Sequence, residues 1–237
     1  MSVRENRHPI RDLIIPEHAL ISVSDKTGLA ELVQGLARAN SRITFYSTGG
    51  TGAAVLDALK ETGEAGGYMP VEMFTGTPEM EGGLVKTLDP KIHAGLLGER
   101  GNPAHIEYLE KAMLNRTGTR GVYFDMMVGN LYPFEEAIAK AGCTPETARA
   151  NIDIGGPAMM MASAKNWHSV AVLSSPRQYG PFLEALERQG GTTAEQRFEL
   201  ARAAMTTIGK YRGAIAKHFR GLDFKRDVLP TLRLEGE

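Results

Sequence analysis

The segment Asn151-Ile-Asp-Ile-Gly-Gly-Pro157 sets an acid just before two glycines, and Ala164-Lys-Asn166 follows it on the next helical stretch. Glycines let the backbone approach a ligand closely. Proline suits the first turn of a helix, because no N–H is needed there. We therefore expect a loop that enters a helix at Pro157, with Asp153 and Lys165 as a charged pair facing one small-molecule pocket.

Two short loops, Ser24-Asp-Lys-Thr27 and Ser47-Thr-Gly-Gly-Thr51, each join a run of strand-forming residues to a helical pattern. Hydroxyls and backbone N–H groups at a helix start attract an anion, and Lys26 adds a full positive charge. The two loops together indicate a phosphate held between them. Ordinary helix capping explains either loop taken alone. The capping residues would be Ser24 or Asp25 in the first loop and Ser47 or Thr48 in the second.

Three further side chains are candidates with an equally simple structural explanation. Tyr132 in Asn130-Leu-Tyr-Pro-Phe134 follows a strand, and the proline after it favours an extended conformation, but an aromatic ring packed under a loop fits as well. Lys86 taken by itself is typical of a solvated surface lysine. His93 is either a base or a structural histidine.

The composition narrows the class of protein. The chain has 237 residues, 42% of them hydrophobic, and a formal net charge of −1, which gives no electrostatic argument for nucleic acid. No apolar run has the length of a signal peptide or a membrane span. The single cysteine, Cys143, excludes an internal disulfide framework, and the six scattered histidines predict no metal site. These features together predict a cytoplasmic protein.

The hydrophobic pattern predicts a three-layer α/β/α sandwich with a mostly parallel, Rossmann-like sheet and carboxyl-terminal helices. Short apolar runs that end in polar turns alternate with helical spacing, which is typical of strands joined by crossover helices. The expected strands are 19–23, 43–46, 124–128 and 169–173, and the expected late helices are 181–188 and 193–219.

The domain boundaries follow from the same pattern. We expect an arm over 1–18, mobile or docking, one α/β domain with its helical segment over 19–221, and a tail over 222–237. Residues 63–101 are rich in glycine and proline and lack a clean period. This stretch is predicted to be a functional loop that wraps over the sheet.

These motifs together resemble the IMP cyclohydrolase domain of the bifunctional purine-biosynthesis protein, which has the methylglyoxal-synthase-like fold. The similarity covers about residues 19–219. It rests on six motifs: Ser22-Val-Ser-Asp-Lys-Thr-Gly28, Ser47-Thr-Gly-Gly-Thr51, Val85-Lys-Thr-Leu88, Asn130-Leu-Tyr-Pro-Phe134, Asn151-Ile-Asp-Ile-Gly-Gly156 and Ala164-Lys-Asn166.

The resemblance implies a division of roles among the residues of these motifs. It assigns catalysis to Lys86, Tyr132, Asp153 and Lys165, and contact with the purine base to Asn130 and Ile154. The implied substrate-binding residues are Ser24, Asp25, Lys26, Thr27, Ser47, Thr48, Gly49, Gly50, Thr51, Thr87, Asn130, Ile154 and Gly155.

The implied reaction closes 5-formamidoimidazole-4-carboxamide ribonucleotide to inosine monophosphate with loss of water, the last step of de novo purine synthesis. Asp153 is expected to aim the carboxamide nitrogen, Lys86 and Tyr132 to stabilise the formyl oxygen, and Lys165, beside Asp153, to donate the proton that water needs to leave. The family uses no metal or organic cofactor and commonly forms dimers. No formyltransferase half follows, so the chain is expected to stand alone, with a separate formyltransferase as a candidate partner.

Two departures from the family pattern leave other functions open. The family usually has Gly-Arg-Val-Lys-Thr-Leu-His-Pro where this chain has Gly83-Leu-Val-Lys-Thr-Leu-Asp-Pro90. Leu84 removes a cation, and loss of a charge-assisted phosphate contact costs about 1.5–3 kcal/mol. Asp89 is expected to put negative charge near the pocket. A non-catalytic nucleotide- or phosphate-sensing paralogue and a methylglyoxal-synthase-like lyase are therefore the alternatives.

Overall fold

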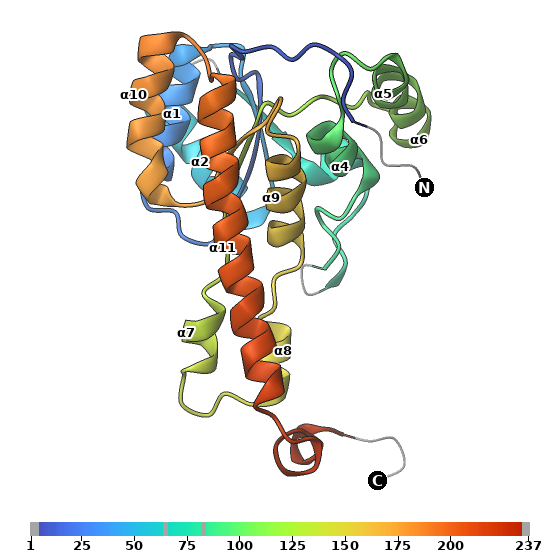
Figure 1. Cartoon of the computed structure of the whole chain (residues 1–237), viewed down its shortest axis with the longest axis vertical. Helices are drawn as coiled ribbons and strands as arrows, with labels where there is room; N and C mark the ends of the chain where they lie inside the picture. The colour runs from blue at the N-terminus through green and yellow to red at the C-terminus, as the bar shows by residue number, and fades with distance from the viewer. Residues whose placement is uncertain (1–4, 64–65, 82–83, 234–237) are drawn as a thin grey trace.

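A sheet of five parallel strands forms the middle layer of the protein in the computed structural model, which describes residues 5–63, 66–81 and 84–233 (Figure 1). The strand order is β3-β2-β1-β4-β5, and every neighbouring pair is parallel. The predicted α/β sandwich is confirmed, with an all-parallel sheet. The strands are β1 (His18–Val23), β2 (Thr44–Ser47), β3 (Gly67–Pro70), β4 (Met126–Asn130) and β5 (Ala171–Leu173).

Helices cover both faces of the sheet, because successive side chains of each strand point to opposite faces. In β1, Ile21 packs into one core and Leu20 into the other, and both are fully buried. The first face carries α1 (Leu29–Ala39), α2 (Gly49–Thr62) and α10 (Tyr179–Gln189). The second carries α3 (Val71–Thr75), α4 (Pro90–Leu97), α9 (Gly155–Lys165) and α11 (Ala194–Arg220).

The prediction of a single wrapping loop over 63–101 is wrong for most of that stretch. It contains β3, α3 and α4, and its longest irregular part is 76–89, of which Gly82 and Gly83 lie outside the described residues. Helix α4 begins where it does because the Asp89 carboxylate accepts a hydrogen bond from the backbone N–H of Lys91, at 2.7 Å. Three short helical segments then lead to β4: α5 (Pro103–Glu107), η2 (Tyr108–Ala112) and α6 (Met113–Thr117).

The carboxyl-terminal half of α11 extends beyond the sheet and is flanked by α7 (Phe134–Ile138) and α8 (Pro145–Ala150) (Figure 1). Phe134, Ala148 and Tyr211 form a separate small core there. A 3₁₀ turn, η3 (Pro176–Gln178), precedes α10. After α11, the chain forms η4 (Phe224–Val228) and η5 (Leu229–Thr231), and 234–237 of the expected tail lie outside the described residues.

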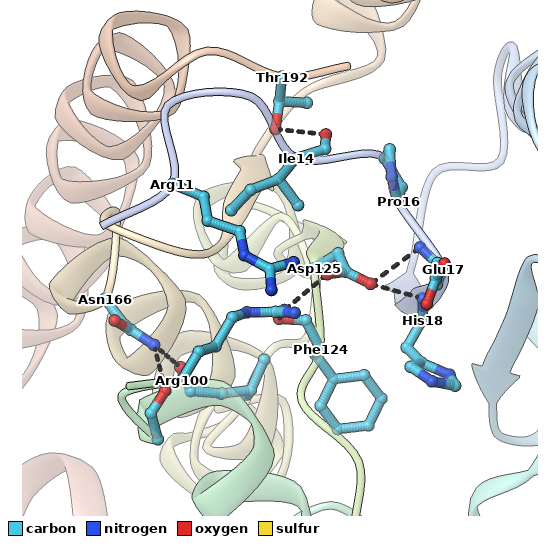
Figure 2. A network of polar contacts seen from close by, with 12 residues as sticks. Arg11, Ile14, Pro16, Glu17, His18, Arg100, Phe124, Asp125, Asn166 and Thr192 are labelled. Carbon is cyan, nitrogen blue, oxygen red and sulfur yellow. Dashed lines mark hydrogen bonds and ion pairs between the residues drawn. The ribbon is translucent and has the colours of Figure 1, made fainter. Parts of the chain in front are cut away.

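The described part of the amino-terminal arm lies against the domain. Ile14 forms an antiparallel bridge with Thr192, and the buried Asp125 carboxylate accepts hydrogen bonds from the backbone N–H groups of Glu17 and His18, each at 2.8 Å (Figure 2). Arg100 pairs with the other oxygen of Asp125 at 2.5 Å. These contacts fix the point where the arm enters β1. Residues 1–4 of the expected arm lie outside the described residues.

Arg197 in α11 is fully buried and ties three distant segments together. Its guanidinium donates to the backbone carbonyls of Arg11, Asp12, Trp167, His168 and Thr192. Removing it leaves buried carbonyl groups without donors. We expect Arg197→Met to lower the free energy of unfolding by about 3–5 kcal/mol in a urea titration. Arg202→Met, an exposed site on the same helix, should change it by less than about 1 kcal/mol.

Candidate active site

The carboxyl edge of the sheet carries the predicted loops at the point where the strand order reverses. The chain runs from β1 outward through β2 and β3, then returns to the other side of β1 for β4 and β5. Ligands of open parallel sheets bind at such a reversal. Here the ends of β1 and β2, the irregular stretch before α4 and the start of α9 enclose a cavity of about 430 Å³. We call it the Lys86 cavity. Of the predicted site residues, it is lined by Thr48, Lys86, Thr87, Asp153, Ile154 and Gly155.

Lys86 brings a partly buried ammonium group to the start of α2. Its Nζ lies 3.7 Å from the position that a Cβ atom on Gly49 would occupy. Thr48 is the N-cap of α2, but no side chain caps the helix. The backbone N–H groups of the first turn are therefore left for another acceptor, with a cation beside them. For α2, this favours the anion site over ordinary capping.

Asp153 is held just before α9. One carboxylate oxygen accepts a hydrogen bond from the backbone N–H of Gly156, at 3.0 Å, while the backbone N–H of Asp153 donates to the Tyr211 hydroxyl, at 2.7 Å. Burial raises the pKa of the Asp153 carboxyl, and the hydrogen bonds from the N–H groups of Gly156 and Gly155 offset part of that rise. The turn needs its glycines, because a Cβ on Gly156 would lie 2.3 Å from Asp153.

We expect the Asp153 carboxyl to titrate above 3.8, the ordinary value, in the folded protein. The folded state disfavours the carboxylate because that group is removed from water. Carbon-13 NMR of the aspartate carboxyls across pH 3–7 would measure it, with Asp153→Asn assigning the resonance. A midpoint for Asp153 at or below 3.8 would contradict the burial argument.

A second cavity, of about 640 Å³, adjoins the first along the same strand ends. We call it the Tyr132 cavity. Ser22 lines the Lys86 cavity, and Ser24, two residues later, lines the Tyr132 cavity. Tyr211 also lines the Tyr132 cavity, and its hydroxyl accepts the hydrogen bond from the Asp153 N–H. Tyr132 is partly exposed there rather than packed under a loop. The predicted site residues that line this second cavity are Ser24, Asp25, Asn130 and Tyr132.

Asn130 holds the loop after β1 in place. Its side-chain oxygen accepts hydrogen bonds from the N–H groups of Ser24 and Asp25, at 2.7 and 2.8 Å, and its amide donates to the Asp25 carbonyl at 2.7 Å. The side chain therefore positions the loop, and the contact with the base that the resemblance implies stays a prediction. Lys26 and Thr27 lie in the same exposed loop and line neither cavity.

The remaining residues of the two predicted loops have structural partners or lie open. Helix α1 begins after Gly28, and neither Ser24 nor Asp25 caps it. The Ser47 hydroxyl donates to the Ile21 carbonyl at 2.7 Å, and the Thr51 hydroxyl to the Val23 carbonyl at 3.0 Å. These two side chains fasten β2 and α2 to β1. Gly50 is exposed at the α2 start.

Comparison with known proteins identifies the family. A family model described as the AICARFT/IMPCHase bienzyme matches residues 163–236. Over 209 residues the chain is 45% identical to the bifunctional purine biosynthesis protein PurH of Magnetococcus marinus, and over 204 residues it is 46% identical to PurH of Rhodospirillum rubrum. This chain belongs to the AICARFT/IMPCHase family. The alignments cover 87% and 86% of the chain but 36% of each PurH, so the chain spans little more than a third of these relatives.

A solved structure supports the fold across nearly the whole chain. The crystal structure of ForH superposes with a TM-score of 0.67 and is 29% identical in sequence. The match covers 86% of this chain and 96% of ForH. This family member therefore has a structural neighbour of similar extent.

Lys165 does not share a pocket with Asp153 within one chain. It is the last residue of α9, exposed, while Asp153 lies before the first. Eleven residues of α-helix separate their backbones by about 15 Å. The expectation of a neighbouring charged pair is wrong for a single chain, because their positions are at opposite ends of a helix.

Leu84 and Asp89, the two departures from the pattern of the AICARFT/IMPCHase family, lie in different surroundings. Leu84 lines the Lys86 cavity and is 58% exposed, so a missing cation there bears directly on the site. The expectation that Asp89 puts charge near the pocket is wrong. Its buried carboxylate caps α4 and pairs with Arg116 at 2.6 Å, and it does not line the cavity.

Sequence reasoning missed Glu79. Its carboxylate lies 2.5 Å from the Lys86 ammonium, so the two side chains form an ion pair at the cavity that Lys86 lines. The signal in the sequence is the acid in Pro78-Glu-Met80, seven positions before Lys86, inside a stretch predicted only as a loop. His93 is partly buried, and burial lowers the pKa of its imidazole, so the ring is neutral near pH 7.

Neither a metal-binding cluster nor a membrane-spanning helix occurs among residues 5–63, 66–81 and 84–233. No group of three or more histidine, cysteine, aspartate or glutamate side chains there is arranged to hold a metal ion. Within the same ranges, no helix has both the length and the apolar character needed to cross a bilayer.

Proposed function

We propose that the chain is an IMP cyclohydrolase, closing 5-formamidoimidazole-4-carboxamide ribonucleotide to inosine monophosphate with loss of water. One observation carries the proposal. Lys86 and Asp153, which the family resemblance makes catalytic, line one cavity beside a helix start that no side chain caps. That combination offers an anion-binding site and an acid–base pair at one edge of the sheet.

The substrate phosphate would bind at the start of α2, against the N–H groups of Thr48, Gly49 and Gly50, with the loop after β1 contributing Lys26. The imidazole ring would then lie toward α9, where Ile154 is exposed at the rim. This arrangement places the carboxamide near Asp153 and the formyl group near Lys86. Because both reacting groups belong to one molecule, the protein needs only to hold them face to face.

Ring closure removes one proton from the carboxamide nitrogen and one from the formamido nitrogen, and it supplies two protons to the departing oxygen. Asp153 accepts the amide proton as the nitrogen bonds to the formyl carbon; its raised pKa suits a base. Lys86 donates to the formyl oxygen as negative charge develops there, and Tyr132 assists from the adjoining cavity. The oxygen leaves as water after a second protonation, while the formamido nitrogen loses its proton and forms the C=N bond of the new ring.

Assembly as a homodimer forms part of the proposal. Lys165 lies exposed at the far end of α9, so a catalytic role requires that it reach the Lys86 cavity of a second copy. A two-fold dimer would give each site a lysine from its partner. The formylated substrate would come from a separate formyltransferase. We place the reaction in the cytoplasm, because a chain with one free cysteine suits a reducing compartment.

Absorbance during incubation of the purified chain with the formylated ribonucleotide tests the proposal, which predicts enzyme-dependent formation of inosine monophosphate. Binding of inosine monophosphate without turnover would favour a nucleotide sensor. Release of methylglyoxal from dihydroxyacetone phosphate would favour the lyase. No turnover of either substrate would end the catalytic proposal.

Leu84→Arg should lower the KM for the formylated ribonucleotide about tenfold. The substitution adds a guanidinium at the cavity wall, and a charge-assisted contact is worth roughly 1.5–3 kcal/mol. Initial rates across substrate concentrations would measure it. Leu97→Arg, an exposed site that does not line the cavity, is the matched control. An unchanged KM in Leu84→Arg would place the phosphate elsewhere.

A further inference from the structure

A third cavity, lined by polar side chains, lies under the amino-terminal arm. It measures about 140 Å³ and is enclosed by residues 6–14, by the segment after α4 and by the segment after α9. None of its lining residues belongs to either cavity of the candidate active site. The side chains that carry the argument are Asn6, His8, Arg11, Arg100, His168 and Ser169.

Two guanidinium groups converge on this cavity without full pairing. Figure 2 shows the guanidinium groups of Arg11 and Arg100 turned toward each other beside Asp125. Arg100 uses one nitrogen for Asp125, while its buried Nε has no hydrogen-bond partner among the described residues. For the Arg11 guanidinium, no hydrogen bond or ion pair is found within 5–63, 66–81 and 84–233.

The neighbouring carboxylates are already engaged. One oxygen of Asp125 accepts two backbone N–H groups and the other pairs with Arg100. Glu99 also lines the cavity, but its carboxylate accepts from the Asn102 amide at 3.3 Å and lies 3.9 Å from His105. Within the described residues, the Arg11 guanidinium and the Arg100 Nε therefore retain hydrogen-bond donors for a further anion. Two guanidinium forks are the geometry that binds oxyanions.

We propose that this cavity is a binding site for inorganic phosphate, which fastens the amino-terminal arm to the domain. Its size selects the ligand, because about 140 Å³ admits a compact tetrahedral ion but is below the roughly 300 Å³ of pockets for larger organic ligands. Arg11 comes from the arm and Arg100 from the domain, so a phosphate between them bridges the two. Asn6, His8 and Ser169 supply further hydrogen-bond donors.

Hydrogen exchange followed by mass spectrometry tests the proposal on the full chain. Exchange is measured for peptides covering 6–14 as inorganic phosphate is added, with sodium chloride at matched ionic strength as the reference. We expect phosphate to slow exchange there. In Arg11→Gln the phosphate concentration for half of the effect should rise about tenfold or more, because a charge-assisted contact is lost. The Arg11 backbone carbonyl, which anchors the arm through Arg197, is retained.

Arg7→Gln is the matched control, since Arg7 lies exposed on the same arm but does not line the cavity. It should respond to phosphate as the unsubstituted chain does. Protection of 6–14 that is absent, or equal in Arg11→Gln and Arg7→Gln, would overturn the proposal. Protection confined to 24–27 and 48–50 would overturn it too, assigning phosphate to the candidate active site. A failure of the proposed ring-closing activity would not affect this test, because hydrogen exchange is measured in the arm.

Discussion

Asp153→Asn is expected to lower kcat for ring closure by about 10²–10⁴-fold while the chain remains folded. Asparagine retains the shape and an oxygen that can accept from the Gly156 N–H, but it cannot take the carboxamide proton. Single-turnover absorbance at saturating substrate measures the chemical step. Asp57→Asn, at an exposed site on α2, is the control and should be unaffected.

The same substitution separates catalysis from stability. Burial raises the folded-state pKa of Asp153 above its unfolded value, so the folded state binds the proton more tightly. Ionising this carboxyl at neutral pH therefore reduces the free energy of unfolding. Asp153→Asn should be at least as stable as the unsubstituted chain at pH 7 in a urea titration. A kcat within about threefold of the original would remove Asp153 from proton transfer.

Lys165→Ala is expected to abolish turnover as a pure variant and to be rescued in a mixed dimer with Asp153→Asn. In a two-fold dimer with exchanged lysines, one site of the mixed dimer holds both intact groups and the other holds neither. Mixed dimers purified through two different tags should recover about half of the original turnover.

Two results would contradict this arrangement. Mixed dimers as inactive as the parent variants would mean that the lysine is not exchanged between copies. Near-normal turnover in Lys165→Ala alone would remove that lysine from the mechanism. Nucleotide binding, measured by calorimetry, should be retained in Lys165→Ala, which shows that the variant is folded.

The sequence predicted the elements whose pattern is local. β1 and β4 are continuous apolar runs ended by polar turns, and α11 has a long helical period, so these segments were predicted to within about two residues. The stretch with β3, α3 and α4 was missed, because its strand is short and partly exposed and its apolar period is interrupted. The parallel topology followed from the alternation of predicted strands and helices along the chain.

The same distinction between local and long-range patterns applies to the candidate site. The starts of α9, two residues before Pro157, and of α2, after Thr48, are signalled by local residues, so the positions of Asp153 and Thr48 could be predicted. The distance between Asp153 and Lys165 depends on the length of the helix between them. Because each helical residue adds to that distance, the two side chains do not share a pocket within one chain. The engagement of Asn130 with the Ser24 loop joins strands 106 positions apart, which no local pattern records.

A crystal structure of the chain with inosine monophosphate would show whether one nucleotide engages the α2 start, Lys86 and Asp153 together. We expect the phosphate within hydrogen-bond distance of the N–H groups at the α2 start, and the pyrimidine edge of the base between the Lys86 ammonium and the Asp153 carboxylate. A nucleotide whose phosphate lies away from Thr48, or whose base faces neither Lys86 nor Asp153, would contradict it.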